Sequence, residues 1–134
     1  MDPEAKRRLM ARFRQRDTKP ELSVRRLLHR MGYRFRVHVG TLPGRPDIVL
    51  PKYRTIIFVH GCFWHRHNGC KVATMPKSNE EFWKAKFERN VIRDRQNVDA
   101  LRSMGFRVLT VWECEVKDSE RLGNYLRGTL APAL

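Results

Sequence analysis

Residues 59–70, VHGCFWHRHNGC, place two cysteines, three histidines and two large aromatic side chains within twelve positions. The run TIIFVH at 55–60 leads directly into this segment. It is short, apolar and rich in β-branched residues, so we expect a buried strand there. Gly61 and Gly69 give the loop after that strand the freedom to fold around a centre. The fold must therefore carry ligand-type side chains at one end of a buried strand.

The rest of the chain alternates helical and strand patterns. A helix is predicted to begin at Thr18, where TKPE forms a capping box with Glu21, and to end at Gly32. SNEE at 78–81 is a second predicted capping box, at the start of a long helix that ends near Met104. Strands are expected at 33–39, 47–50, 55–60 and 106–112, followed by a short C-terminal helix. This order predicts an α/β fold with helices flanking a mixed β-sheet.

The chain length of 134 residues leaves room for one domain with its own core. We expect a basic N-terminal arm at residues 1–17 and a single domain at residues 18–134. The long helix carries an apolar stripe that is expected to pack on the sheet, formed by Phe87, Val91, Val98 and Leu101.

Charge narrows the choice of partner. The chain has 28 Lys and Arg against 14 Asp and Glu, a formal net charge of +14. Positive charges in such excess repel one another unless a bound polyanion neutralises them. Nucleic acid is therefore the expected partner, ahead of an acidic membrane surface or ribosomal packing. No apolar run is long enough to cross a membrane, and the N-terminus has no secretory signal pattern. Three cysteines, an odd number, indicate a reducing, cytoplasmic compartment rather than a disulfide framework.

The cysteines suggest a metal site. Cys62, His67 and Cys70 share one loop, and Cys114 follows the predicted strand at 106–112. If that strand lies parallel to 55–60, both strand ends reach the same sheet edge, and the four side chains can form a tetrahedral Cys₃His site for structural Zn²⁺. The alternative is three buried cysteines that pack as small apolar residues.

A second constellation surrounds Asp47. Asp47 begins the strand that returns to 55–60, so its carboxylate can lie near the start of the histidine loop and bind a hard cation such as Mg²⁺. His65 can then take a proton from water, while His60 or Glu21 orients the water or the leaving group, which suits phosphodiester hydrolysis. An aspartate that caps a strand beside solvated histidines explains the same residues equally well.

Three blocks carry a family resemblance: LPGRPDIVLPKYRTIIFVHGCFWHRHNGC, FWKAKFERNVIRDRQNV and GFRVLTVWEC. From about Thr18 to Glu115 they closely resemble the very-short-patch repair (Vsr) endonucleases, bacterial enzymes that nick DNA at T:G mismatches. The resemblance implies a restriction-endonuclease-like fold. It also accounts for the FVH at 58–60, where ordinary restriction enzymes carry an acid-x-Lys motif.

The resemblance implies a role for each matching residue. Asp47 looks like the metal-binding carboxylate for catalytic Mg²⁺, with the main-chain oxygen of Val59 as its partner. His65 resembles the catalytic histidine, and His60 and Glu21 match its supporting residues. The structural zinc ligands match Cys62, His67, Cys70 and Cys114.

The same pattern gives the aromatic residues a role in DNA recognition. Apolar side chains that enter the base stack cost unstacking free energy, and a mismatch lowers that cost. The residues expected to enter the stack or to read the mismatch are Phe63, Trp64, Trp83, Lys86 and Asn90, with Met10 of the arm entering from the opposite groove. Ordinary burial of the aromatic rings in a core is the alternative.

Two other functions fit the chain. One is a non-catalytic, zinc-stapled module that binds distorted DNA. The other is a related nuclease that cuts other mismatches or makes double-strand breaks as a dimer. The resemblance itself implies a monomer that acts on T:G-mismatched duplex DNA in the bacterial cytoplasm, with mismatch-repair proteins as possible partners.

Overall fold

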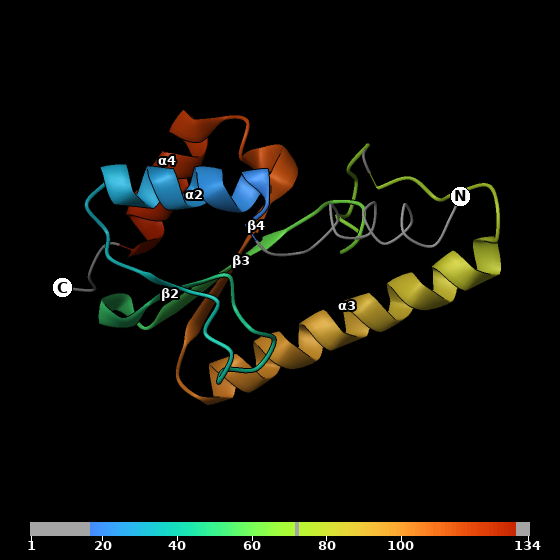
Figure 1. Ribbon diagram of the computed structural model, residues 1–134, viewed down its shortest axis with the longest axis horizontal. Helices are drawn as coiled ribbons and strands as arrows, with labels where there is room; N and C mark the ends of the chain where they lie inside the picture. The colour runs from blue at the N-terminus through green and yellow to red at the C-terminus, as the bar shows by residue number, and fades with distance from the viewer. Residues whose placement is uncertain (1–16, 72, 131–134) are drawn as a thin grey trace, which may run out of the picture.

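The computed structural model describes residues 17–71 and 73–130 of the chain (Figure 1). Met10 and the rest of the predicted arm up to residue 16 lie outside the described residues. The elements, in chain order, are α2 (Lys19–Arg30), β1 (Arg36–Val37), β2 (Ile48–Leu50), a 3₁₀ turn (Pro51–Tyr53), β3 (Thr55–His60), α3 (Glu80–Ser103), β4 (Arg107–Trp112), a second 3₁₀ turn (Glu113–Glu115) and α4 (Ser119–Leu130). The predicted α/β class is confirmed.

The four strands form one mixed sheet in the order β1-β2-β3-β4. The β1–β2 and β2–β3 pairs are antiparallel, whereas β3 and β4 run parallel, with His60 opposite Trp112. The parallel pair places the ends of β3 and β4 at one edge of the sheet, which is the condition on which the predicted metal site depended. Cys62 and Cys114, which follow these two strands, are thereby brought to the same edge.

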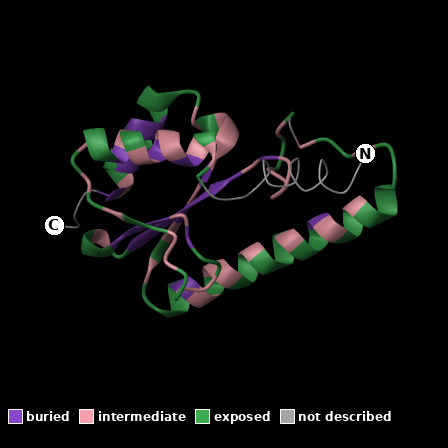
Figure 2. Ribbon diagram, viewed as in Figure 1, coloured by how far each residue is buried: buried purple, intermediate pink, exposed green. Residues whose placement is uncertain are grey.

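Helices cover both faces of the sheet (Figure 1). One core joins the sheet to α2 and α4 through Val24, Leu28, Ile57, Val111, Leu122 and Leu126, among others. The opposite core joins it to the C-terminal part of α3 through Val49, Ile56, Phe58 and Leu101. Every residue of β2 and β3 is buried, which is why these strands read as continuous apolar runs (Figure 2). Among the described helices, none is both long and apolar enough to span a membrane.

Both predicted capping boxes need correction. Thr18 caps α2 through a hydrogen bond from the Glu21 backbone N–H (3.4 Å), but the Glu21 carboxylate accepts from the backbone N–H of Asp17, not of Thr18. At α3 the cap residue is Asn79, in a left-handed conformation (φ 56°), and its side chain makes no capping hydrogen bond. Asparagine tolerates a left-handed conformation better than most residues do. The helix therefore begins one residue later than it would with Ser78 as its cap.

Two predictions, one of a strand and one of the packing of α3, were only partly correct. The strand expected at 33–39 is reduced to Arg36–Val37, because His38 adopts a left-handed conformation (φ 50°) that ends the extended backbone. On α3, Val98 and Leu101 pack on the sheet as predicted, but Val91 is 38% exposed. The N-terminal half of α3 runs past the sheet (Figure 1), so no strand lies beneath this part of the apolar stripe.

Candidate active site

A pocket of about 660 Å³ opens between the sheet and α3. The predicted carboxylate Asp47 and the predicted histidines His60 and His65 all line it, together with Val59. Its remaining walls come from the loop before β2 and from α3, and are formed by His38, Gly40, Gly44, Arg45, Phe58, Asn90, Arg93, Asp94 and Asn97. The sequence therefore pointed to residues that the fold does bring together.

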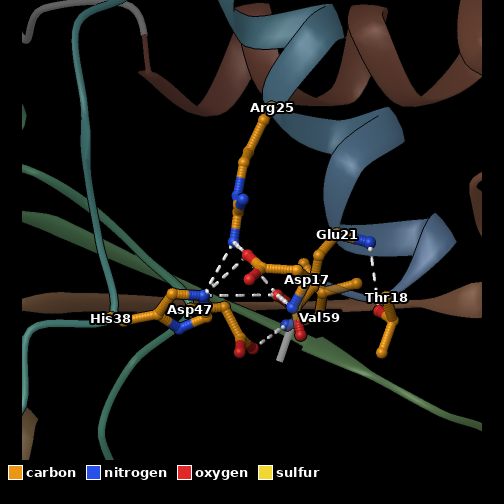
Figure 3. A network of polar contacts seen from close by, with 7 residues as sticks. All are labelled: Asp17, Thr18, Glu21, Arg25, His38, Asp47 and Val59. Atoms are coloured by element: carbon orange, nitrogen blue, oxygen red, sulfur yellow. Dashed lines mark hydrogen bonds and ion pairs between the residues drawn. The ribbon is translucent and has the colours of Figure 1, made fainter. Parts of the chain in front are cut away.

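Asp47 lies immediately before β2, where its carboxylate faces the neighbouring strand β3. One carboxylate oxygen accepts a hydrogen bond from the Val59 backbone N–H at 2.7 Å (Figure 3). The pKa of Asp47 is raised to about 7, mainly by burial and also by the nearby Glu21 carboxyl group, while the Val59 hydrogen bond acts in the opposite direction. Two carboxyl groups side by side make this corner of the pocket attractive to a divalent cation.

Glu21 reaches this corner from α2 and is only 1% exposed. Its Oε2 accepts from the Asp17 backbone N–H at 3.0 Å and from Arg25 Nη2 at 3.2 Å. Burial raises the pKa of Glu21. Glu21, which was expected both to complete the capping box and to support the catalytic residues, is thus a buried acid beside Asp47.

The two catalytic candidates on β3 and its loop stack against each other. The rings of His60 and His65 lie 3.8 Å apart at 7°. His60 is buried, and burial followed by the neighbouring His65 lowers its pKa to about 4, so it is neutral at physiological pH. The neutral, buried ring of His60 packs flat against the ring of His65 and does not compete with it for a proton.

His65 has a carboxylate partner that sequence reasoning missed. Its Nδ1 lies 2.6 Å from Asp94 Oδ2, and both side chains are largely buried. An ionised carboxylate only accepts, so Nδ1 of His65 donates, and Nε2 of the neutral ring keeps its lone pair. Asp94 follows Asn90 by one helical turn, and that spacing is the signal that could have revealed it.

The four predicted metal ligands converge at the edge where β3 and β4 end. His67 Nδ1 lies 3.6 Å from Cys62 Sγ and 3.4 Å from Cys114 Sγ, and with Cys70 all four ligand atoms lie within 4.8 Å of one another. Burial raises the pKa of the Cys62 thiol to about 12 when it carries no cation. His67 also stacks on Trp112 at 4.3 Å. This cluster can hold a metal ion.

Phe63, Trp64 and Trp83 gather in a cluster outside the sheet. Phe63 lies 5.1 Å from Trp64, and Trp64 lies 5.9 Å from Trp83, measured between ring centroids. Phe87, which was expected to pack on the sheet, instead contacts Phe63 edge-on at 5.2 Å and carries the Arg66 guanidinium on its face. All three predicted DNA-contacting rings are only partly buried.

Two polar side chains of α3 attach to this cluster. The Lys86 ammonium lies 5.2 Å from the Trp64 ring centroid and 5.6 Å from that of Trp83. Asn90 donates from Nδ2 to the main-chain oxygen of Trp64 at 3.2 Å. The predicted recognition residues that the structure describes therefore lie in one cluster of contacts.

Comparisons with known proteins agree with this geometry. The family model described as DNA mismatch endonuclease Vsr matches residues 1–71. The chain is 48% identical to the type II nicking enzyme V.XorIIP of Xanthomonas oryzae, over 99% of this chain and 97% of that protein. It is 47% identical to the DNA mismatch endonuclease Vsr of Escherichia coli, over 80% of this chain and 68% of that protein. The type II nicking enzyme V.NmeAIP of Neisseria meningitidis is 43% identical over 89% of this chain and 87% of that protein.

The chain belongs to the Vsr family. It is a DNA endonuclease of the nicking class, and so a hydrolase, and the alternative of a non-catalytic DNA-binding module is set aside. The net charge of +14 suits the DNA substrate of a Vsr enzyme. Arg45 and Arg93 line the same pocket as Asp47 and His65, and their positive charges suit the binding of phosphate groups.

Proposed function

We propose that this Vsr-family chain nicks double-stranded DNA on the 5′ side of the T in a T:G mismatch, as the first step of very-short-patch repair. The observation that carries the proposal is that Asp47 and His65, which lie 18 positions apart in the sequence, line one pocket. A carboxylate for a cation and an imidazole with a free nitrogen are the groups that metal-assisted hydrolysis of a phosphodiester requires.

Asp47 and the main-chain oxygen of Val59 would hold Mg²⁺. The fit rests on the buried carboxyl pair, because a hard divalent cation with oxygen ligands relieves the repulsion between Asp47 and Glu21. When bound, Mg²⁺ would stabilise the developing charge on the phosphoryl oxygens. Glu21, held rigidly by α2, orients water at this corner of the pocket.

His65 acts as the general base in this proposal. Its Nε2 takes a proton from the attacking water, and Asp94 stabilises the imidazolium that forms through the Nδ1 hydrogen bond. His60 stays neutral behind the ring and keeps its plane fixed. Arg45 and Arg93 bind the phosphate groups that flank the scissile bond.

The aromatic cluster would open the duplex at the mismatch. Phe63, Trp64 and Trp83 now cover one another, and base stacking could replace these ring contacts at little net cost. Lys86 and Asn90 would then face the polar edges of the mispaired bases. Met10, outside the described residues, is proposed to enter from the opposite groove.

We propose Zn²⁺ for the Cys62, His67, Cys70 and Cys114 cluster. Three thiolates and one imidazole are a donor set that zinc prefers, and four protein ligands leave no open position for catalysis. The ion would staple the histidine loop to the end of β4, which fixes the main chain on both sides of His65.

Several broader features belong to the same proposal. We propose that the sheet and its helices form a restriction-endonuclease-like domain over residues 18–134, preceded by a basic arm at 1–17. The enzyme would act as a monomer in the bacterial cytoplasm, with mismatch-repair proteins as partners.

A strand-resolved nicking assay tests the function. Duplexes labelled on either strand and carrying T:G, T:T or a normal pair are incubated with Mg²⁺ or with EDTA. We expect one Mg²⁺-dependent nick, in the T strand of the T:G duplex alone. Asp47→Ala is expected to abolish the nick while DNA binding persists, and robust cleavage by this variant would refute the metal role. Cutting of both strands would instead favour a dimeric nuclease.

A further inference from the structure

Arg25 is the centre of a polar network beside the pocket that the proposed mechanism does not use. A single nitrogen, Nη2, lies 2.9 Å from Asp17 Oδ1, 2.9 Å from His38 Nε2 and 3.2 Å from Glu21 Oε2 (Figure 3). The ligand atoms of these three partners lie within 4.8 Å of one another, which is a grouping suited to a cation. The guanidinium group of Arg25 already supplies that positive charge.

The network fixes the orientation of one carboxyl group. Glu21 Oε2 accepts two hydrogen bonds, from Arg25 and from the Asp17 backbone N–H, and the side chain is 1% exposed. With both donors in place, the carboxyl group cannot rotate without breaking a buried hydrogen bond. Its position beside Asp47 is therefore set by α2 and by Arg25 together.

His38 and Asp17 hold Arg25 in turn. His38 Nε2 lies 2.9 Å from Arg25 Nη2 and 3.1 Å from Asp17 Oδ1, and His38 also lines the pocket with Asp47. Because a guanidinium only donates, a ring that bonds Arg25 accepts through Nε2 and makes no hydrogen bond to Asp17, whose carboxylate pairs with Arg25 directly. His38 has a left-handed backbone (φ 50°), and its ring contacts Arg25 of α2. Asp17, the residue just before the Thr18 cap of α2, completes the network.

Stability alone is a poor explanation for this arrangement. Arg25 is a charged side chain only 16% exposed, and its Nε is buried without a hydrogen-bond partner among the described residues. A buried donor left unpaired costs free energy, and an apolar side chain would avoid that cost. What an apolar side chain cannot do is hold the Glu21 carboxyl group in place.

We infer that Arg25 is a positioning residue for the nicking reaction: it holds Glu21 in register with Asp47, while His38 and Asp17 hold Arg25. This inference rests on the proposed function, because it concerns the same carboxyl pair. It assigns Arg25 and His38 a supporting role at the corner of the pocket that holds Asp47 and Glu21.

Arg25→Met tests the inference, with Arg26→Met as the matched control. Both variants lose one positive charge from α2, but Arg26 is exposed. Single-turnover nicking is measured with protein in excess over a labelled T:G duplex and Mg²⁺ saturating, and DNA affinity is measured in EDTA. We expect the Arg25→Met rate to fall about 10- to 100-fold below that of Arg26→Met, as for other residues that support a metal site without binding the ion. DNA affinity should match the control within about twofold.

His38 provides a conservative rescue. In His38→Gln the amide oxygen can still accept from Arg25, so the rate should stay within a few-fold of wild type, whereas His38→Leu should lose rate as Arg25→Met does. Equal rates for Arg25→Met and Arg26→Met would overturn the inference. A fall in DNA affinity that accounts for the whole loss of rate would also overturn it, because Arg25 would then be a DNA contact.

Cation binding to the intact, DNA-free protein separates this inference from the proposed function. Mn²⁺ serves as the probe, and Arg25→Met is expected to bind it about tenfold more weakly than Arg26→Met. If wild-type protein fails to nick any duplex, the proposed function falls and this titration decides the inference, with equal affinities refuting it. Should Arg25→Met not fold, Arg25→Lys, which retains a point charge without the planar fork, replaces it in both measurements and should show an intermediate loss.

Discussion

Asp94→Asn should slow nicking while leaving DNA binding intact. The substitution keeps the size of the side chain but removes the negative charge that faces His65 Nδ1 at 2.6 Å. Asparagine can still offer its carbonyl oxygen, yet a neutral amide stabilises a developing imidazolium far less than a carboxylate does. Its amide nitrogen, if turned toward the ring, would favour the tautomer with the proton on Nε2, which cannot act as a base.

The size of the effect follows from the burial of this pair. The side chains of His65 and Asp94 are 17% and 25% exposed, so solvent screens the interaction only partly. A hydrogen bond to a charged group contributes roughly 1.5–3 kcal/mol. At about 1.36 kcal/mol for each tenfold change in rate, losing it in the transition state slows nicking about 10- to 100-fold.

The assay is single-turnover nicking of a labelled T:G duplex with protein in excess, so that product release does not contribute. Asp99→Asn is the control, because Asp99 lies on the same helix, is exposed, and loses the same charge. DNA affinity in EDTA should be unchanged in both variants. An Asp94→Asn rate within twofold of the control would refute the assignment of His65 as a base oriented by this carboxylate.

Four further predictions concern binding of the cation, stability of the metal-free protein, the cysteine cluster and the loop before β2. Because the pKa of Asp47 is raised to about 7, its proton competes with Mg²⁺ below that pH, and the Mg²⁺ concentration for half-maximal nicking should be about tenfold higher at pH 6 than at pH 8. In metal-free protein, the raised pKa of Asp47 contributes to the free energy of unfolding at low pH, and this contribution is lost as the pH rises through about 7. The melting temperature of metal-free protein should therefore fall over this pH range. Asp47→Asn should remove this part of the pH dependence. Cys114→Ser should lower the zinc content measured by elemental analysis and lower the melting temperature, and equal zinc in both proteins would contradict the staple. Gly44→Ala should destabilise the fold by about 1 kcal/mol or more in denaturant unfolding, since Gly44 has φ +76° and an added Cβ would lie 2.9 Å from the Asn97 side chain; an unchanged midpoint would contradict this close contact.

The elements that could be predicted from sequence are those with strong local signals. The buried strand Thr55–His60 and the end of α2 before Gly32 follow from apolar runs and from a glycine with positive φ. The convergence of Cys62 and Cys114 needed one further assumption, a parallel neighbour for β3, and the sheet order supports it. The signals for the strand and for the helix end depend only on residues near one another in the chain.

The residues that sequence reasoning missed depend on contacts between distant elements. Asp94 lies in the charged run RDRQ, where most side chains face solvent. Its four-residue spacing from Asn90 places the two on one helix face, but the contact with His65 on a distant loop is seen only in the fold. Arg25 and His38 lie 13 positions apart on different elements, and His38 has a left-handed backbone that a histidine does not predict. The exposure of Val91 likewise depends on where the sheet ends beneath α3.

Helix α3 links the recognition surface to the catalytic pocket. Lys86, Asn90 and Asp94 follow one another at four-residue intervals, so they share one face of the helix. Lys86 and Asn90 contact Trp64, while Asp94 contacts His65, the next residue in the chain. Under the proposed function, a DNA base that displaces Trp64 would act on the main chain that carries His65, because α3 contacts both residues. The proposal therefore implies that entry of a ring into the base stack and alignment of the imidazole are coupled through α3.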